Sequence, residues 1–184
     1  MKSSEFSYDV LMTPRDYAET VVLPTVREFL AERGDLRRAI LSCVTSYHLI
    51  DHLAHAQRSA HTGKRASKKE REAEAEKIRD KLRSVCASSF EVVQGICNGT
   101  KHADLVPMQH VPVFAFDVSG AGWDQGRWDV PGLQVEHNGE KLFIDWCLQA
   151  LLLTLRANYG PLLDALDLTF CDAAFRGQAG WNEA

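Results

Sequence analysis

Apolar residues in the first hundred positions recur at the three- and four-residue spacing of an α-helix, which predicts a largely helical protein. The first predicted helix begins at Thr13, whose side chain can cap it, and Pro14 suits its first turn. Its apolar face extends to about Glu32. Pro24 lies inside this run, and because proline has no backbone N–H it should kink or break the helix there.

Two longer helices follow in the predicted order. The second spans residues 36–58 or beyond, and apolar residues nearly surround it, so we expect it at the centre of a bundle. The third begins at a capping box in residues 67–70, where a Ser and a Glu each accept a hydrogen bond from the other's backbone N–H. Its first turns are almost all charged and should project into solvent. Its apolar stripe consists of Ile78, Leu82, Val85, Val92 and Ile96.

A small antiparallel β-hairpin or sheet is predicted over residues 111–144. Asn138 and Gly139 separate two short apolar runs within this region. Asn and Gly tolerate the positive φ angles that a two-residue hairpin turn requires, so this pair marks the turn.

The C-terminal part adds a helical region at 145–168 and a loose tail at 176–184. The elements together predict a mainly α fold, an antiparallel helical bundle with the β-hairpin inserted before the last long helix. A chain of 184 residues fits a single domain, 1–184, whose bundle occupies residues 14–105.

The composition predicts a protein of the cytoplasm without membrane contact. Hydrophobic residues make up 45% of the chain and charged residues 25%, as in ordinary globular domains. The five cysteines are scattered singly and their number is odd, which argues against a secreted disulfide framework and against a cysteine-rich zinc site. No apolar stretch approaches the roughly 20 residues that span a bilayer. The N-terminus also lacks the apolar run of a signal peptide.

The sequence lacks the motifs of several enzyme classes. We find no phosphate-binding loop, no dinucleotide fingerprint, no serine-hydrolase elbow and no zinc-protease motif. These motifs hold the cofactors or the catalytic groups of their classes, so we expect a protein that uses no cofactor.

The net charge of −4 is unevenly distributed along the chain. Residues 64–83 hold nine basic and five acidic side chains, which predicts a locally basic helix on an acidic body. Such a helix can contact the phosphates of RNA, or it can be a solvated surface. The like-charged pairs Glu70–Glu74 and Glu76–Asp80 are four residues apart and argue against a helix laced with ion pairs.

The segment 97–102, with the sequence Cys-Asn-Gly-Thr-Lys-His, is the most informative local pattern. If the third helix continues through Gly99, then Asn98 and His102 share one face; otherwise the helix ends at Asn98 and Gly99. A long amphipathic helix followed by Asn98, a short spacer and His102 resembles proteins of the HEPN superfamily. Their motif has an Arg, a polar residue, a spacer and a His in this order, and Cys97 stands at the position of the Arg.

This resemblance implies a protein that binds RNA or a nucleotide and pairs as a homodimer with the 97–102 segments at or near the twofold interface. In catalytic members, of toxin or defence kind, it implies RNA cleavage without a metal ion. His102 would be the general acid or base, Asn98 would orient it and Lys101 would contact phosphate. An Arg grips phosphate with two hydrogen bonds, which Cys97 cannot do, so a catalytically degenerate relative is the alternative within the family.

The second predicted helix gathers four polar residues on one side. They fall within an arc of about 100°, and polar groups on a buried face must be paired, so they predict a polar pocket. The four are His48, Asp51, His52 and His55. His48 and His52 are also a candidate metal pair that needs a further ligand, such as His102 or His110.

Two functions from other classes are therefore alternatives to RNA or nucleotide binding. The first is a non-catalytic protein-interaction module, in which residues 97–102 are only the end of a helix. The second is a metal-binding helical protein that uses His48 and His52. A third arrangement joins the candidates, with Asp51 or His52 lying near His102 in one mixed polar pocket.

Overall fold

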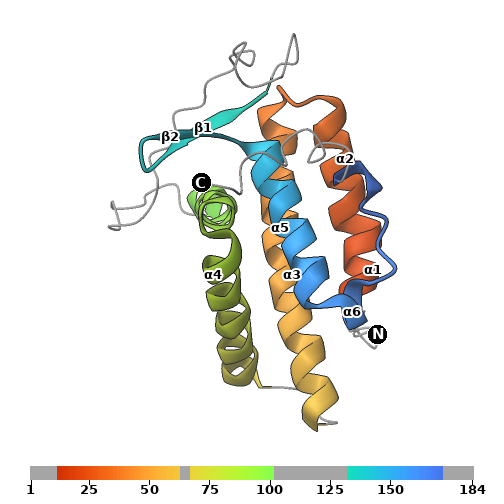
Figure 1. Cartoon of the computed structure of the whole chain (residues 1–184). Coiled ribbons are helices and arrows are strands. Elements are labelled where there is room, and N and C mark those ends of the chain that lie inside the picture. The colour runs from red at the N-terminus through yellow and green to blue at the C-terminus, as the bar shows by residue number, and fades with distance from the viewer. Residues whose placement is uncertain (1–11, 63–66, 102–131, 172–184) are drawn as a thin grey trace, which may run out of the picture.

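The computed structural model describes residues 12–62, 67–101 and 132–171 and confirms the mainly α fold, with a two-stranded antiparallel sheet before the last long helix (Figure 1). His102, His110, the start of the predicted sheet region and the tail at 176–184 lie outside the described residues. The elements in chain order are α1 (Pro14–Tyr17), the π-helical turn η1 (Ala18–Val22), α2 (Leu23–Ala31), α3 (Leu36–Thr62), α4 (Lys68–Lys101), β1 (Gln134–His137), β2 (Glu140–Phe143), α5 (Ile144–Asn158) and α6 (Gly160–Leu163).

The first helical run begins at the predicted cap and passes through Pro24 without a break. Thr13 Oγ1 accepts a hydrogen bond from the backbone N–H of Asp16 at 3.0 Å, and the Asp16 carboxylate accepts one from the N–H of Thr13 at 3.3 Å. The π-helical turn η1 lies directly before Pro24. Because a proline ring meets the carbonyl four residues earlier, a wider turn accommodates it, and the predicted break is replaced by this local distortion.

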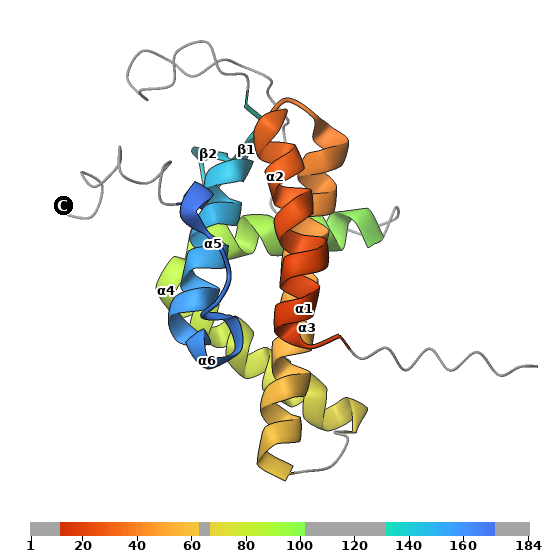
Figure 2. The same cartoon turned by 90° about the vertical axis from the view of Figure 1, so that its right-hand side faces the viewer.

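Helix α3 is the central element of the bundle, as the sequence predicted. It contacts α1, η1 and α2 on one side and α4 and α5 on the other (Figures 1 and 2). Leu49, Ile50 and Leu53 are fully buried. The apolar surround is incomplete, however, because Leu41 is 43% exposed.

Helix α4 follows the predicted capping box but is bent, which the sequence did not predict. Ser67 Oγ and Glu70 form the reciprocal cap. At Cys86 the backbone leaves the helical region, with φ −139° and ψ 51°, and the second half of α4 turns away to cross α3 (Figure 2). Val85 is therefore 54% exposed, so its place in the apolar stripe was wrong, while the other four stripe residues are buried.

The hairpin forms at the predicted turn. Asn138 and Gly139 adopt φ angles of 53° and 82°, and the strands pair in the register that sets His137 opposite Glu140. His137 is buried in β1, and its Nε2 lies 2.9 Å from the carboxylate of Glu91 in the second half of α4. This contact fixes the hairpin against α4, and β2 leads directly into α5.

None of the helices in the described part of the chain has the length and apolar character that crossing a bilayer requires.

Gly139→Ala should destabilise the protein by about 1–2 kcal/mol, because an L side chain is disfavoured at positive φ. A Cβ at Gly139 meets no atom within 4 Å, so the cost comes from the backbone alone. Gly99→Ala is the matched control. A Cβ there also meets nothing within 4 Å, but Gly99 is helical, so alanine should stabilise by about 0.5–1 kcal/mol. Urea unfolding measures the stability of both variants, and a Gly139→Ala variant as stable as the wild type would contradict the assigned turn.

Candidate functional site

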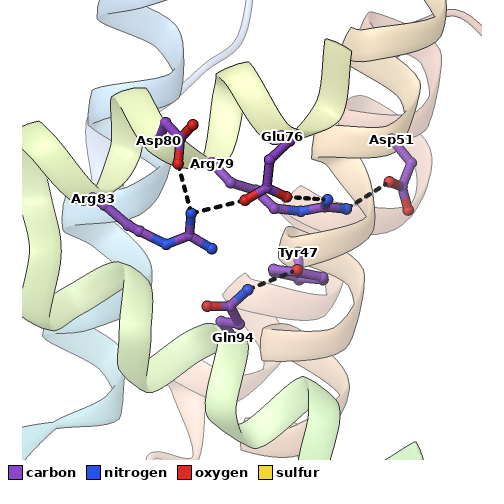
Figure 3. A network of polar contacts seen from close by, with 7 residues as sticks. All are labelled: Tyr47, Asp51, Glu76, Arg79, Asp80, Arg83 and Gln94. Atoms are coloured by element: carbon purple, nitrogen blue, oxygen red, sulfur yellow. Dashed lines mark hydrogen bonds and ion pairs between the residues drawn. The ribbon is translucent and has the colours of Figure 1, made fainter. Parts of the chain in front are cut away.

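A cluster of polar side chains lies inside the bend of α4, where α4 crosses α3 (Figure 3). We call it the elbow cluster. Its members come from three chain segments: α3, the first half of α4 and the second half of α4. They are Tyr47, Asp51, Glu76, Arg79, Asp80, Arg83 and Gln94.

Carboxylates hold the two guanidinium groups of this cluster. One oxygen of Glu76 accepts a hydrogen bond from Arg79 at 3.0 Å and the other accepts one from Arg83 at 2.9 Å. Asp80 binds the same Arg83 nitrogen at 2.7 Å, and Asp51 of α3 lies 3.4 Å from Arg79. The hydrogen bond from Arg83, followed by that from Arg79, keeps the pKa of Glu76 below its ordinary value, so Glu76 is ionised and bridges both arginines at neutral pH.

Aromatic rings form the floor of the elbow cluster. The guanidinium carbon of Arg79 lies 5.6 Å from the ring centre of Tyr47, and that of Arg83 lies 5.5 Å from the ring centre of Phe90. The two rings lie 6.2 Å apart in a stacked arrangement. Gln94 Nε2 donates a hydrogen bond to the Tyr47 hydroxyl at 3.0 Å. Each cation is thus positioned by a ring below it and a carboxylate beside it.

The chemistry open to this arrangement is the recognition of oxyanions rather than covalent catalysis. Guanidinium groups that a ring and a carboxylate already position lose little freedom when they bind an oxyanion. Three carboxylates already share the two guanidiniums, so an incoming anion has to compete with them. The side chains of these carboxylates are half-exposed or exposed, and water therefore weakens their hold.

The structure places part of the predicted 97–102 site. Helix α4 continues through Gly99 to Lys101, so the alternative in which the helix ends at Asn98 and Gly99 is wrong. Cys97 is fully buried in the core, and Asn98 is half-buried. The side chain of Lys101 and the whole of His102 lie outside the described residues, so their predicted roles stay predictions. A side chain at position 97 faces the core and cannot reach a phosphate at the surface.

The polar residues predicted on one side of α3 divide into two groups. His48 Nδ1 lies 3.2 Å from the carboxylate of Asp51, which also contacts Arg79 and so belongs to the elbow cluster. His52 points to the N-terminal side instead. Its Nδ1 lies 3.3 Å from the carbonyl oxygen of Met12, and its ring stacks on Tyr17 with 4.0 Å between centres. His55 is half-buried one turn after Asp51.

The candidate metal pair gains no further ligand within the described ranges. No group of three or more His, Cys, Asp or Glu side chains there is arranged to hold a metal ion. A carbonyl oxygen can only accept, so Nδ1 of His52 carries a proton in its contact with Met12. Only Nε2 of that ring is then available to a metal. His102 and His110, the further ligands considered from the sequence, lie outside the described residues.

The charged run in the first half of α4 is laced with ion pairs, contrary to the expectation from its like-charged spacings. Each acidic residue of the two like-charged pairs has a basic partner. These contacts are Glu70 with Arg58, Glu74 with Lys77, Glu76 with Arg79 and Arg83, and Asp80 with Arg83. Because opposite charges lie three or seven residues apart on α4 or on a neighbouring helix, they outweigh the repulsion between acids four residues apart. In the described part of α4, Lys69, Arg71 and Lys81 are exposed and form no ion pair.

Sequence reasoning missed the elbow cluster as a site. One signal for it was present, because Arg79 and Arg83 are four residues apart and each follows an acidic residue by three positions. No local pattern linked them to Tyr47 or Gln94, since those contacts require the bend at Cys86.

Comparisons of the chain with protein-family models, with curated proteins and with solved structures gave no match. The resemblance to HEPN proteins therefore rests on the 97–102 segment and the order of the helices alone, and it stays a prediction.

Glu70 should make the stability of the protein depend on pH. A hydrogen bond from Arg58, then those from the backbone and side chain of Ser67, lower its pKa from 4.5 to about 2. A lowered pKa means that the ionised form stabilises the fold, fully above pH 4.5 and progressively less as the pH falls toward 2.

Urea unfolding of the wild type and of Glu70→Gln from pH 7 to pH 2 tests this prediction. The variant should be less stable at pH 7, and the difference should vanish across that window. Glu72→Gln is the control, because Glu72 is exposed and its contact with Lys68 is long, at 3.8 Å, and therefore weak. A difference that is unchanged at pH 2 contradicts the assignment to the carboxylate charge.

Cys97→Arg restores the missing residue of the HEPN motif in sequence but should not restore a phosphate contact. Position 97 is fully buried, so the charge would lose its water and the variant should be destabilised by about 3–5 kcal/mol. Asn98→Arg, at the half-buried neighbour, should cost less than about 1 kcal/mol. Thermal unfolding compares the two. A Cys97→Arg variant as stable as the wild type would show that position 97 can turn to the surface.

Proposed function

We propose that this protein is an HEPN-like RNA-binding protein in which the C-terminal end of α4 contacts the RNA and cleavage has been lost. The observation that supports this most directly is that the helix continues through the motif while the side chain at the arginine position is buried. The helix runs on through Gly99 to Lys101, while the position of the motif arginine, Cys97, is buried. Binding needs only a surface of polar and basic groups, whereas the cleaving relatives also hold the phosphate with the guanidinium that this chain lacks.

The continuous helix supports a shared face for the motif residues. Asn98 and Lys101 are three positions apart on α4, and residues three or four apart on a helix are neighbours on its surface. His102 is the next residue of the chain, so one further helical position would set it four residues after Asn98. Asn98, Lys101 and His102 would then contact the RNA and, as the resemblance implies, two copies would pair through this end of α4.

Lys101→Ala and His102→Ala should weaken the binding of a mixed-sequence single-stranded RNA, measured with the metal chelator EDTA present. Loss of one phosphate contact should lower the slope of log affinity against log salt by about 0.7 for Lys101→Ala. The wild type should leave the RNA intact on a denaturing gel. Arg37→Ala is the matched control, because Arg37 is an exposed cation on α3 and has no ion pair among the described residues.

Three outcomes separate the alternatives. RNA cleavage by the wild type that disappears in His102→Ala contradicts the loss of activity and establishes a ribonuclease that works without the motif arginine. An RNA affinity that falls as much in Arg37→Ala as in Lys101→Ala indicates general attraction between charges instead of a specific site. No binding by a folded wild type rejects the proposal and favours a protein-interaction module.

A further inference from the structure

Arg83 presents an unused bidentate edge inside the bend of α4. Its Nη1 donates to both Glu76 and Asp80, at 2.9 and 2.7 Å. Within the described ranges no hydrogen bond involves its Nε or Nη2, and in Figure 3 these two nitrogens face the second half of the helix, where Gln94 lies. Nε together with one Nη forms the planar fork that binds two oxygens of a phosphate.

Other donors in the elbow cluster also lack acceptors. Arg79 Nε is buried and has no hydrogen-bond partner among the described residues. The Tyr47 hydroxyl accepts a hydrogen bond from Gln94, and no acceptor for its own hydrogen lies in the described part of the chain. Of these donors only Arg79 Nε is buried, and buried donors are normally paired, while the Arg83 fork and the Tyr47 hydroxyl each keep a donor available to a ligand rich in acceptors.

We propose that the elbow cluster binds one phosphate group, with the Nε–Nη2 edge of Arg83 as its bidentate contact and the Tyr47 hydroxyl as a further donor. The inference rests on the proposed RNA binding and adds a second contact point to it. Gln94 and Asn98 are one turn apart on α4, so a strand that lies along this half of the helix can reach both Asn98 and the elbow cluster. The phosphate belongs to an RNA strand or to a free nucleotide, and the two sources are separated by the probe.

The carboxylates of the cluster determine how tightly a phosphate binds there. Glu76 shares its two oxygens between Arg79 and Arg83, and its side chain is 50% exposed. Its negative charge orients both guanidiniums and at the same time repels a phosphate. Neutralising Glu76 should therefore strengthen phosphate binding.

The test measures the fluorescence anisotropy of a labelled, mixed-sequence single-stranded RNA with four variants at several salt concentrations. Arg83→Gln should bind about tenfold more weakly than the wild type, and its salt slope should fall by about 0.7. Arg83→Lys keeps the charge but not the fork, so it should recover only part of the affinity. Glu76→Gln should bind more tightly than the wild type.

Lys81→Gln is the charge-matched control on the same half of α4, because Lys81 is exposed and has no ion pair among the described residues. If Arg83→Gln weakens binding no more than Lys81→Gln, the elbow site is rejected while RNA binding stands. Full affinity of Arg83→Lys overturns the bidentate contact. Circular dichroism and thermal unfolding confirm that each variant is folded before it is compared.

A wild type that binds no RNA rejects the proposed function, and uridine 5′-monophosphate then decides the elbow site by itself. An increase in the melting temperature of the wild type that is absent from Arg83→Gln supports a phosphate site for a free nucleotide. No increase, or an equal increase in Arg83→Gln, overturns the elbow site.

Discussion

Burial on both sides of the bend in α4 is the constraint from which the rest of the arrangement follows. Ile78 and Leu82 before the bend and Phe90 and Val93 after it all lie in one core. The bend lets both halves of α4 contribute to the core that it shares with α3 and α5. Each large apolar side chain gains about 1.5–3 kcal/mol from burial, whereas a helical hydrogen bond lost at the bend costs about 1 kcal/mol.

The bend also determines where the charged residues of α4 lie. Arg79 and Arg83 are on a helix that by itself would face solvent, yet the second half of α4 brings Phe90 and Gln94 beneath them. Tyr47 of α3 then lies between the two halves, since it stacks with Phe90, contacts Arg79 and accepts a hydrogen bond from Gln94. A single residue of the central helix therefore joins both halves of α4 and the polar cluster.

The ion pairs of α4 organise this region more than they stabilise it. Each of them has at least one exposed partner, and ion pairs that water reaches contribute about 0–1 kcal/mol each. Their effect is positional: Glu76 and Asp80 fix one edge of the Arg83 guanidinium and turn the other edge toward the bend. The proposed RNA contacts at Arg83 and at Asn98 would then lie on the two halves of one bent helix, and Gln94 of the elbow cluster is one turn before Asn98.

The sequence by itself determined the elements of this fold, because their signals are local. Thr13, the Ser67–Glu70 pair and the Asn138–Gly139 turn each act within four residues, and each lies where the sequence predicted. Spacing alone likewise predicted that α3 would be central. Only the tertiary structure revealed the bend at Cys86, since neither Pro nor Gly lies beside it and the contacts that α4 makes with α3 and α5 join segments far apart in the chain. With the bend came the exposure of Val85, the burial of Cys97 and the meeting of Tyr47, Arg83 and Gln94, because contacts between residues far apart in the chain leave no periodic pattern in it.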